Sequence, residues 1–296
     1  MEVKAIDYVV PMVFHQDAEW QKTLLLAGRR YSEDDLIEFV RYRSWNTEEL
    51  LIRCVLKFMP WLRNIYILLA QESQKQEWMA TLSPKIKVVY HRDFMPQWAL
   101  PTFNSCSIEM FLHLIPGISE RFIYGNDDMF PLAPLSEEDF FVGDTPCLHH
   151  EEKSFPANPS IFHLSCRNGL NLVAKEFGKR YNNTLLRGGH SITPMLKSTW
   201  EHLWEIGKSE IQVSVTRFRD ARNFNQWLCP WWHYLAGKYI DKTPKRSYVS
   251  TKNSIEEVVR TMVNSKGIVC VNDNECVKDY MRYGRAVAEA IEEKLK

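Results

Sequence analysis

The sequence predicts an α/β fold in which a mostly parallel, Rossmann-like sheet is flanked by helices and followed by a mainly helical C-terminal lobe. Strand-like apolar runs alternate with helical patterns through the first 130 residues, which is typical of βαβ units. Helical spacing of large apolar residues then dominates residues 161–240. With 296 residues and 45% hydrophobic content, the chain can bury a substantial core.

The first quarter of the chain predicts strand, helix, helix and strand. Ala5–Val13 is rich in β-branched residues, and we expect a buried first strand that ends near Pro11. Ser32 precedes acidic residues and helically spaced apolar residues, which favours a helix beginning there. A second helix is expected from Thr47 to Pro60, and Asn64–Ala70 reads as a buried strand.

The next elements continue the alternation. Ile86–Tyr90 predicts a third strand, and a helix capped by Asn104 or Ser105 should run through Leu114 before Pro116-Gly117 ends it. A fourth strand is expected at Phe122–Tyr124. These units would place the parallel strands of the sheet side by side.

The second half predicts fewer strands. Weak periodicity over 131–160 favours loops above the active face, and after the helical region we expect a helix at Ile255–Val263, a strand at Gly267–Val271 and a terminal helix. We treat residues 1–296 as a single domain. Its sub-regions are an α/β core at 1–130, a loop region at 131–160, a helical lobe at 161–240 and a closing segment at 255–296.

Charge and cysteine usage exclude several classes of protein. The 37 basic and 37 acidic side chains cancel, so we expect no nucleic-acid partner. The seven cysteines are scattered without a CxxC pair, which is typical of a reducing compartment. Neither a signal peptide nor an apolar run of membrane-spanning length is visible, and we therefore expect a cytoplasmic protein.

The stretch RFIYGNDDMF, residues 121–130, is the strongest candidate site. The apolar strand breaks at Gly125 and delivers Asn126, Asp127 and Asp128 at its carboxyl end, where α/β sheets bind ligands. Paired carboxylates suit Mg²⁺ or Mn²⁺, which bind together with phosphates. The alternative is a solvated turn, because Gly-Asn-Asp is also common turn chemistry.

Several motifs together resemble the Stealth family of sugar-phosphate transferases. They are Asp7 in the first strand, FMPWLRNIYILL at 58–69, LPTFNS at 100–105, HLIPGISERFIYGNDDMF at 113–130, and His190 followed by PMLKSTW. The second of the family's four blocks resembles residues 41–130. The third resembles residues 186–234, where GGHSITPMLK carries the family histidine and VTRFRDARNFNQ the family arginine.

The other two blocks resemble the family less closely. GIVCVNDN at 267–274 suggests the fourth block. The first reads DYVVPMVFHQDAEW, which keeps Asp7, Asp17 and Trp20 but has Phe14-His15 where the family has Asp/Asn-Gly. This departure leaves the identity of the donor nucleotide open.

The resemblance implies transfer of a hexose 1-phosphate from a nucleoside-diphosphate sugar to a hydroxyl of a glycan or glycolipid. The products would be a phosphodiester and a nucleoside monophosphate, in capsular or cell-surface polysaccharide synthesis. It further implies a setting at the inner membrane surface, with the protein peripherally associated. Phosphoryl transfer of this kind depends on positioning and charge stabilisation, so it needs a base and a cation or arginines.

The matched positions suggest roles for four residues. His190 would be the general base, and Gly188-Gly189 would let it approach a ligand closely. Arg219 would stabilise the charge on the phosphoryl group. Asp127 and Asp128 would hold Mg²⁺ or Mn²⁺. For each, a structural role is the alternative, and Arg217 and Arg222 compete with Arg219. Further substrate contacts are expected from Asp7, Asn104, Ser105, Glu109, Asn126, Lys197 and Arg217, although capping alone would explain Asn104 and Ser105.

Other interpretations remain open. The cluster Cys147, His149, His150, Glu151 and Glu152 offers zinc-ligand types, but adjacent histidines on a strand face opposite ways, which favours loop polarity or acceptor contacts. An ordinary metal-dependent glycosyltransferase would use the same donor and release a nucleoside diphosphate. A sugar-nucleotide or glycan-binding protein without turnover is the alternative from another class.

Overall fold

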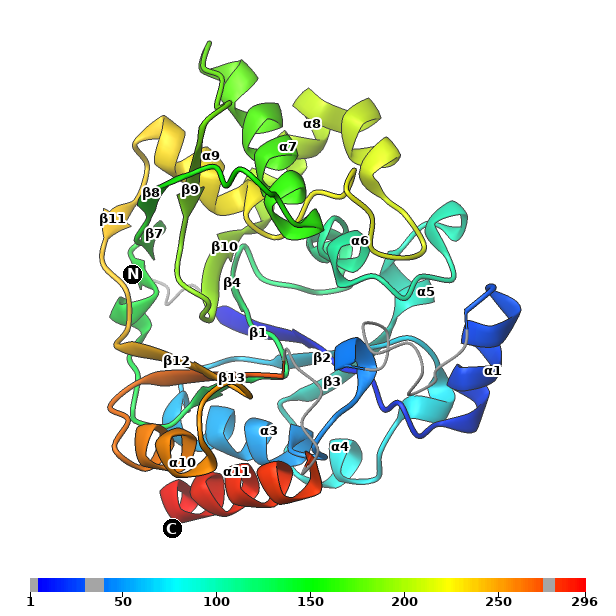
Figure 1. The fold of residues 1–296 in the computed structure, drawn as a ribbon, viewed down its shortest axis with the longest axis vertical. Coiled ribbons are helices and arrows are strands. Elements are labelled where there is room, and N and C mark those ends of the chain that lie inside the picture. The colour runs from blue at the N-terminus through cyan, green and yellow to red at the C-terminus, as the bar shows by residue number, and fades with distance from the viewer. Residues whose placement is uncertain (1–4, 30–39, 274–279) are drawn as a thin grey trace.

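The computed structural model describes residues 5–29, 40–273 and 280–296, and a five-stranded sheet in the order β10-β4-β1-β2-β3 forms its centre (Figure 1). The strands are β1 (Ile6–Pro11), β2 (Ile65–Leu69), β3 (Ile86–Tyr90), β4 (Arg121–Tyr124) and β10 (Thr193–Leu196). The first four pair in parallel, and β10 is antiparallel to β4. The order of the parallel strands is that of one Rossmann half, with its switch point between β1 and β4. The predicted fold class is confirmed.

Helices cover both faces of this sheet. In Figure 1, α3 (Glu48–Phe58), α10 (Ile255–Val263) and α11 (Tyr280–Leu295) lie below it, and α7 (Ile161–Glu176), α8 (Lys197–Ser214) and α9 (Leu228–Ala236) lie above. Strand β1 shows why both faces are needed, because Tyr8 and Val10 belong to one core cluster and Val9 to the other. Within the described ranges, no helix is long and apolar enough to cross a bilayer.

The predicted helices that lie on described residues are confirmed except near residue 110. Helix α6 (Ser105–Glu109) is short, and the expected continuation is a separate 3₁₀ turn, Leu112–Leu114. The change of direction buries Met110, Phe111 and Leu112 in the core. The helix predicted from Ser32 falls mostly on residues 30–39, outside the described residues. Three further helices of the amino-terminal half are α1 (Ala18–Leu26) and the four-residue helices α4 (Trp78–Thr81) and α5 (His91–Phe94).

The expectation of loops over 131–160 holds only in part, because short strands interrupt the loops. Strands β5 (Met129–Pro131), β6 (Phe141–Val142), β7 (Thr145–Leu148) and β8 (Glu151–Ser154) run through or into this region. Each has at most four residues, which is too few to show a period of two. The predicted helical lobe is confirmed in α7, α8 and α9, but it also contains β9 (Thr184–Arg187), which pairs with β8, and part of the central sheet, β10.

A second sheet brings the end of the chain to the carboxyl edge of the first. Its order is β12-β13-β5, where β12 is Arg246–Ser250 and β13 is Ile268–Asn272. The predicted strand at β13 is confirmed, and β12 lies in a polar segment that the pattern did not mark. The backbone N–H of Val271 donates to the carbonyl of Asp128 over 2.9 Å. The β4–β5 turn is therefore held against β13.

Candidate active site

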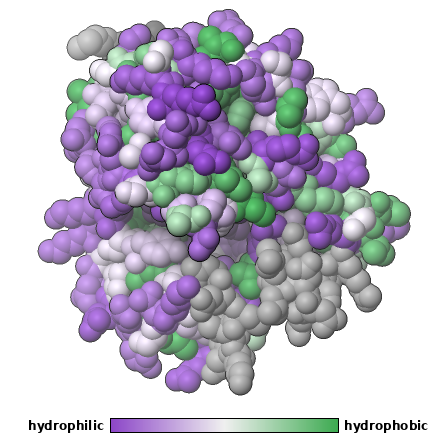
Figure 2. Space-filling model, turned by 45° about the horizontal axis from the view of Figure 1, so that its top comes forward, coloured by the Kyte–Doolittle hydropathy of each residue, from purple (hydrophilic) through white to green (hydrophobic). Residues whose placement is uncertain are grey.

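A cleft of about 660 Å³ opens at the carboxyl edge of β1 and β4, where the strand order reverses. The space-filling view shows the surface hollowed across the middle of the molecule, beneath a largely hydrophilic upper half (Figure 2). Most residues predicted for the site line this cleft, although they come from distant parts of the sequence. They are Asn104, Ser105, Glu109, Asn126, Asp127, Asp128, His190 and Arg219.

The turn that carries Asp127 and Asp128 is partly buried, and it is not an ordinary solvated turn. A Cβ on Gly125 would lie 2.6 Å from the hydroxyl of Tyr8, so only glycine fits over that ring without movement. Burial, together with the smaller effects of the charges of Asp128 and Glu48, raises the pKa of Asp127 to about 8. The turn thus brings two carboxyl groups close together, and Asp127 keeps its proton up to about pH 8 unless a cation offsets the repulsion.

Asp128 has one occupied and one unoccupied oxygen. Its Oδ2 accepts hydrogen bonds from Asn272 Nδ2 at 3.1 Å and from the Cys270 thiol at 3.3 Å. Its Oδ1 is buried, and no group among the described residues donates to it. Because a buried carboxylate oxygen without a partner is costly, this atom fits a bound cation. The residues of this turn therefore fit the Mg²⁺ or Mn²⁺ expected from the sequence.

His190 lies between β9 and β10 with Nε2 4.0 Å from Asp128 Oδ2, and its ring meets Tyr248 edge to face. The expected role of the preceding glycines is wrong in one respect. A Cβ on Gly188 would lie 2.2 Å from the Trp227 ring, and one on Gly189 would lie 2.0 Å from the Arg246 guanidinium. The glycines therefore admit protein side chains, which pack against the backbone and fix the position of the loop.

Arg219 faces the same cleft from the loop after α8. Its Nη2 donates to the hydroxyl of Ser105 at 2.8 Å, which aims the guanidinium across the start of α6.

Burial raises the pKa of the nearby Glu109 to about 7. The Gln226 N–H at 2.7 Å, the charge of Arg219 and the Tyr124 hydroxyl at 3.1 Å all act in the opposite direction and lower this pKa. Glu109 thus links the Arg219 side of the cleft to β4.

Asn104 positions the loop that carries Arg219. Its Oδ1 caps α6 by accepting from Cys106 N at 3.1 Å. Its Nδ2 donates to the carbonyls of Thr216 and Phe218, at 3.2 and 3.3 Å. Because both side-chain atoms are used within the protein, capping and positioning account for Asn104 fully. A contact of Asn104 with substrate, through its position in the lining of the cleft, stays a prediction.

Three residues predicted to contact substrate do not line the cleft. Asp7 is fully buried near the start of β1, where Arg63 and the N–H groups of Asn64 and Ser119 bond its carboxylate. Lys197 begins α8 and pairs with Glu201 at 3.6 Å. Arg217 lines a separate cavity beside Trp98. For two of them the reason is position, because Asp7 is the second residue of β1 and Leu196, just before Lys197, pairs with Arg121 at the start of β4, so both lie at the opposite edge of the sheet.

Several residues that line the cleft or lie beside it were missed. Arg43 lines it and binds Asp273, with Nη2 2.6 Å from Oδ1, and Glu48 is buried beside the Asp127 turn. Asn272 and Cys270 reach Asp128 from β13, at separations of 144 and 142 residues. The only signals were the RYR of 41–43 and the ND of 272–273. Neither motif indicates which residue it contacts, because the contacts join residues that are far apart in the sequence.

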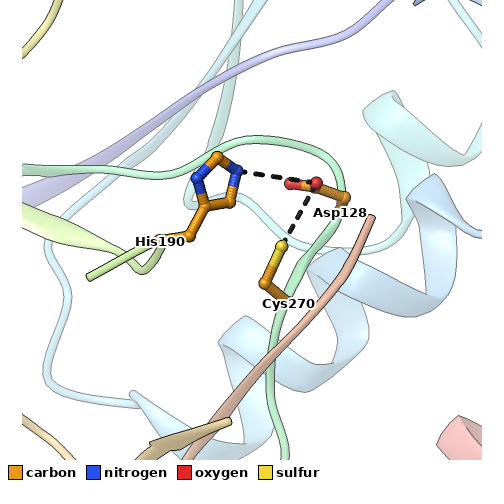
Figure 3. A group of neighbouring side chains, drawn as sticks. All are labelled: Asp128, His190 and Cys270. Atoms are coloured by element: carbon orange, nitrogen blue, oxygen red, sulfur yellow. Dashed lines mark hydrogen bonds and ion pairs between the residues drawn. The ribbon is translucent and has the colours of Figure 1, made fainter. Parts of the chain in front are cut away.

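The zinc-type cluster at 147–152 has other partners. His149 Nδ1 lies 2.7 Å from Asp241 Oδ1, His150 packs on Tyr234, and the Cys147 thiol donates to the Glu138 carbonyl. In the described part of the chain, only Asp128, His190 and Cys270 gather three metal-ligating atoms, all within 4.8 Å of one another (Figure 3).

The fold and the cleft define a class: an α/β protein whose acidic turn, histidine and arginine converge at the strand edge where phosphorylated ligands bind. Residues 41–147 match the model for Stealth protein CR2, conserved region 2. The chain is 30% identical over 310 residues to the receptor polysaccharide phosphotransferase WefC of Streptococcus gordonii, covering 94% of this chain and 92% of that protein. It is 33% identical over 261 residues to the capsular polysaccharide phosphotransferase fcs1 of Haemophilus influenzae, covering 82% and 69%.

A third relative is the capsular polysaccharide phosphotransferase WcwK of Streptococcus pneumoniae, 28% identical with 93% of this chain and 92% of that protein covered. The chain belongs to the Stealth family, and it is an enzyme of the sugar-phosphate transferase class.

Proposed function

We propose that this enzyme moves a hexose 1-phosphate from a nucleoside-diphosphate sugar to a hydroxyl of a glycan or glycolipid, in capsular or cell-surface polysaccharide synthesis. The observation that carries the proposal is the convergence of Asp127, Asp128, His190 and Arg219 on one cleft at the switch point. The names of the relatives support a polysaccharide acceptor. We place the reaction in the cytoplasm at the inner membrane surface, where such glycans are assembled.

The cleft residues can be assigned to the steps of this reaction. His190 accepts the proton of the acceptor hydroxyl as that oxygen attacks the phosphorus next to the sugar. The bond from this phosphorus to the bridging oxygen breaks, and the nucleoside monophosphate leaves. Arg219, held by Ser105, stabilises the charge on the phosphoryl oxygens. The cleft volume, about 660 Å³, lies within the usual range for small-molecule sites.

Asp127 and Asp128 are the residues proposed to hold Mg²⁺ or Mn²⁺. When bound, such an ion would neutralise diphosphate charge, which these two carboxylates otherwise repel. The unpartnered Oδ1 of Asp128 and the raised pKa of Asp127 both support a cation here. Asn126 lies in the same turn and lines the cleft, where we propose that its amide contacts the donor.

Nucleotide release tests the proposal. The enzyme is incubated with a panel of nucleotide sugars and a glycan acceptor, and mass spectrometry follows donor loss and the nucleotide formed. Release of a nucleoside monophosphate with a phosphodiester product is expected. Release of a diphosphate would instead indicate a glycosyltransferase. Donor binding by calorimetry without any turnover, unaltered by His190→Ala, would indicate a binding protein.

A further inference from the structure

Three ligand types of different hardness meet at the edge of the cleft, which Asp128 and His190 line and beside which Cys270 is buried. Asp128 follows β4, His190 lies between β9 and β10, and Cys270 is in β13, so three separate segments of chain converge (Figure 3). The Cys270 Sγ lies 3.3 Å from Asp128 Oδ2, and His190 Nε2 lies 4.0 Å from the same oxygen. A hard cation such as Mg²⁺ has no use for a thiol or an imidazole. Cys270 therefore adds a property that the proposed transfer reaction does not need.

We propose that Asp128, His190 and Cys270 form a binding site for a thiophilic divalent ion, Zn²⁺ in particular. Thiolate, imidazole and carboxylate are the three ligand types that zinc uses in proteins. With three protein ligands, the fourth position of a tetrahedral ion remains open toward the cleft.

The spacing of the three groups suits zinc. Bond lengths of ~2.0–2.3 Å in a tetrahedral site separate neighbouring ligand atoms by roughly 3.3–3.8 Å. The thiol–carboxylate distance is already 3.3 Å, and all three ligand atoms lie within 4.8 Å of one another. A small rotation of the His190 side chain, which is 35% exposed, would close the remaining gap. Asp128 also has its buried Oδ1 available, with no donor to it among the described residues.

Binding requires one proton to leave. The Cys270 thiol donates its hydrogen bond to Asp128, and zinc binds the thiolate, so the thiol proton passes to solvent when the Zn–S bond forms. Asn272 can keep its hydrogen bond to Asp128 Oδ2 throughout, which holds the carboxylate in place. No electron is transferred, and no further reactant is needed.

Zinc at this site would inhibit transfer. His190 Nε2 would be bound to the ion and could not accept a proton from the acceptor hydroxyl. This consequence rests on the proposed function, whereas zinc binding does not. The two are therefore separable by measuring binding directly.

Cobalt titration of the full chain, without donor or acceptor, is the decisive experiment. Co²⁺ replaces Zn²⁺ and gives an intense near-ultraviolet thiolate-to-cobalt band when sulfur is a ligand. We expect this band to appear at one equivalent and to disappear on adding Zn²⁺. Absence of the band in the wild-type protein would overturn the proposal, whatever the transfer activity.

Two cysteine variants sharpen the test. Cys270→Ser should weaken zinc affinity, measured by calorimetry with a competing chelator, by more than about tenfold and should abolish the cobalt band. Cys147→Ser is the matched control, since Cys147 is also a buried strand cysteine, and its thiol donates to the Glu138 carbonyl, away from Asp128 and His190. Equal zinc affinity in all three proteins would contradict the site. Should Cys270→Ser unfold, as circular dichroism would reveal, the wild-type cobalt spectrum still decides.

The effect of zinc on transfer activity is tested separately from zinc binding. In excess Mg²⁺, equimolar Zn²⁺ should reduce transfer at least about tenfold, and a chelator should restore it. A cobalt band without any transfer under all conditions would support the metal site while rejecting the proposed function. Zinc binding with full transfer activity would overturn the inhibitory role.

Discussion

Asp7 and Asp128 lie on or beside neighbouring parallel strands, yet their surroundings are opposite. Asp7, near the amino end of β1, is fully buried and bonded by Arg63 and two backbone N–H groups. Asp128, just past the carboxyl end of β4, has a buried oxygen without a donor among the described residues and a second carboxylate beside it. The carboxylate at the amino end of the sheet is fully hydrogen-bonded, whereas the one at the carboxyl end has an oxygen without a donor among the described residues.

This difference separates stability from function. A fully bonded carboxylate holds β1, β2 and the Gly117–Ser119 turn together, because Arg63 also donates to the Gly117 carbonyl. Charges left without partners cost stability and are retained where a ligand supplies the missing interactions. Substitutions at the two ends should therefore affect different measurements.

The largest effect is expected at Asp128. Asp128→Asn should reduce transfer about a thousandfold, because it removes the charge proposed to hold the cation. Its free energy of unfolding should stay the same or rise, since repulsion with Asp127 is relieved. Steady-state kinetics and urea denaturation measure the two quantities. Asp139→Asn, at an aspartate paired with Lys242, is the control, and a comparable loss there would contradict the assignment.

The opposite pattern is expected at Asp7. Asp7→Asn should lower the free energy of unfolding by about 3 kcal/mol, toward the lower end for a broken buried pair, because the Arg63 side chain is 43% exposed and can be hydrated. Turnover per folded molecule should be unchanged. A raised KM for the donor at unchanged stability would instead place Asp7 in substrate binding, as first expected from the sequence.

Two arginines in one loop provide a smaller contrast. Arg219→Lys should lower transfer by roughly tenfold to a hundredfold, since an ammonium cannot reproduce the guanidinium fork on a phosphoryl group. Arg217→Lys should change it less than about twofold, because Arg217 faces a different cavity. Kinetics of the two variants under the same conditions give the comparison, and equal losses would argue against a specific role for Arg219.

The last contrast concerns the pH dependence of stability. The pKa of Glu109 is raised by burial from 4.5 to about 7, so the folded state binds more protons there than the unfolded state does between these values. Wild-type stability should therefore fall relative to Glu109→Gln as pH rises from about 5 to about 8. Denaturant unfolding at both values measures this difference. An identical pH dependence in the two proteins would show that burial does not govern Glu109.

Long apolar strands were predictable from the sequence, whereas short edge strands were not. The runs at β1 and β2 are buried along their lengths, and their composition shows it. Strand β10 contains Pro194 and β7 contains Pro146, which argue against a strand interior and are tolerated because these elements are short. The four parallel strands, and hence the fold class, were nevertheless recoverable.

The site was predictable only in part, for a geometric reason. Asp127 and Asp128 follow a strand directly, so their place at the carboxyl edge could be deduced. Asp7 is the second residue of β1, four residues and roughly 13 Å from that edge, which the strand direction alone could have shown. Cys270 and Asn272 reach Asp128 from more than 140 residues away, and no local pattern specifies such a contact.

The fate of the phosphate next to the sugar tests the central claim most directly. A nucleotide sugar labelled with ³²P only at that phosphate is incubated with the enzyme and a glycan acceptor, and the products are separated. If the unpartnered charges at the carboxyl edge serve phosphoryl transfer, the label passes to the glycan and the released nucleotide is unlabelled. Label retained in a released nucleoside diphosphate would show that the sugar alone is transferred, which would contradict the account.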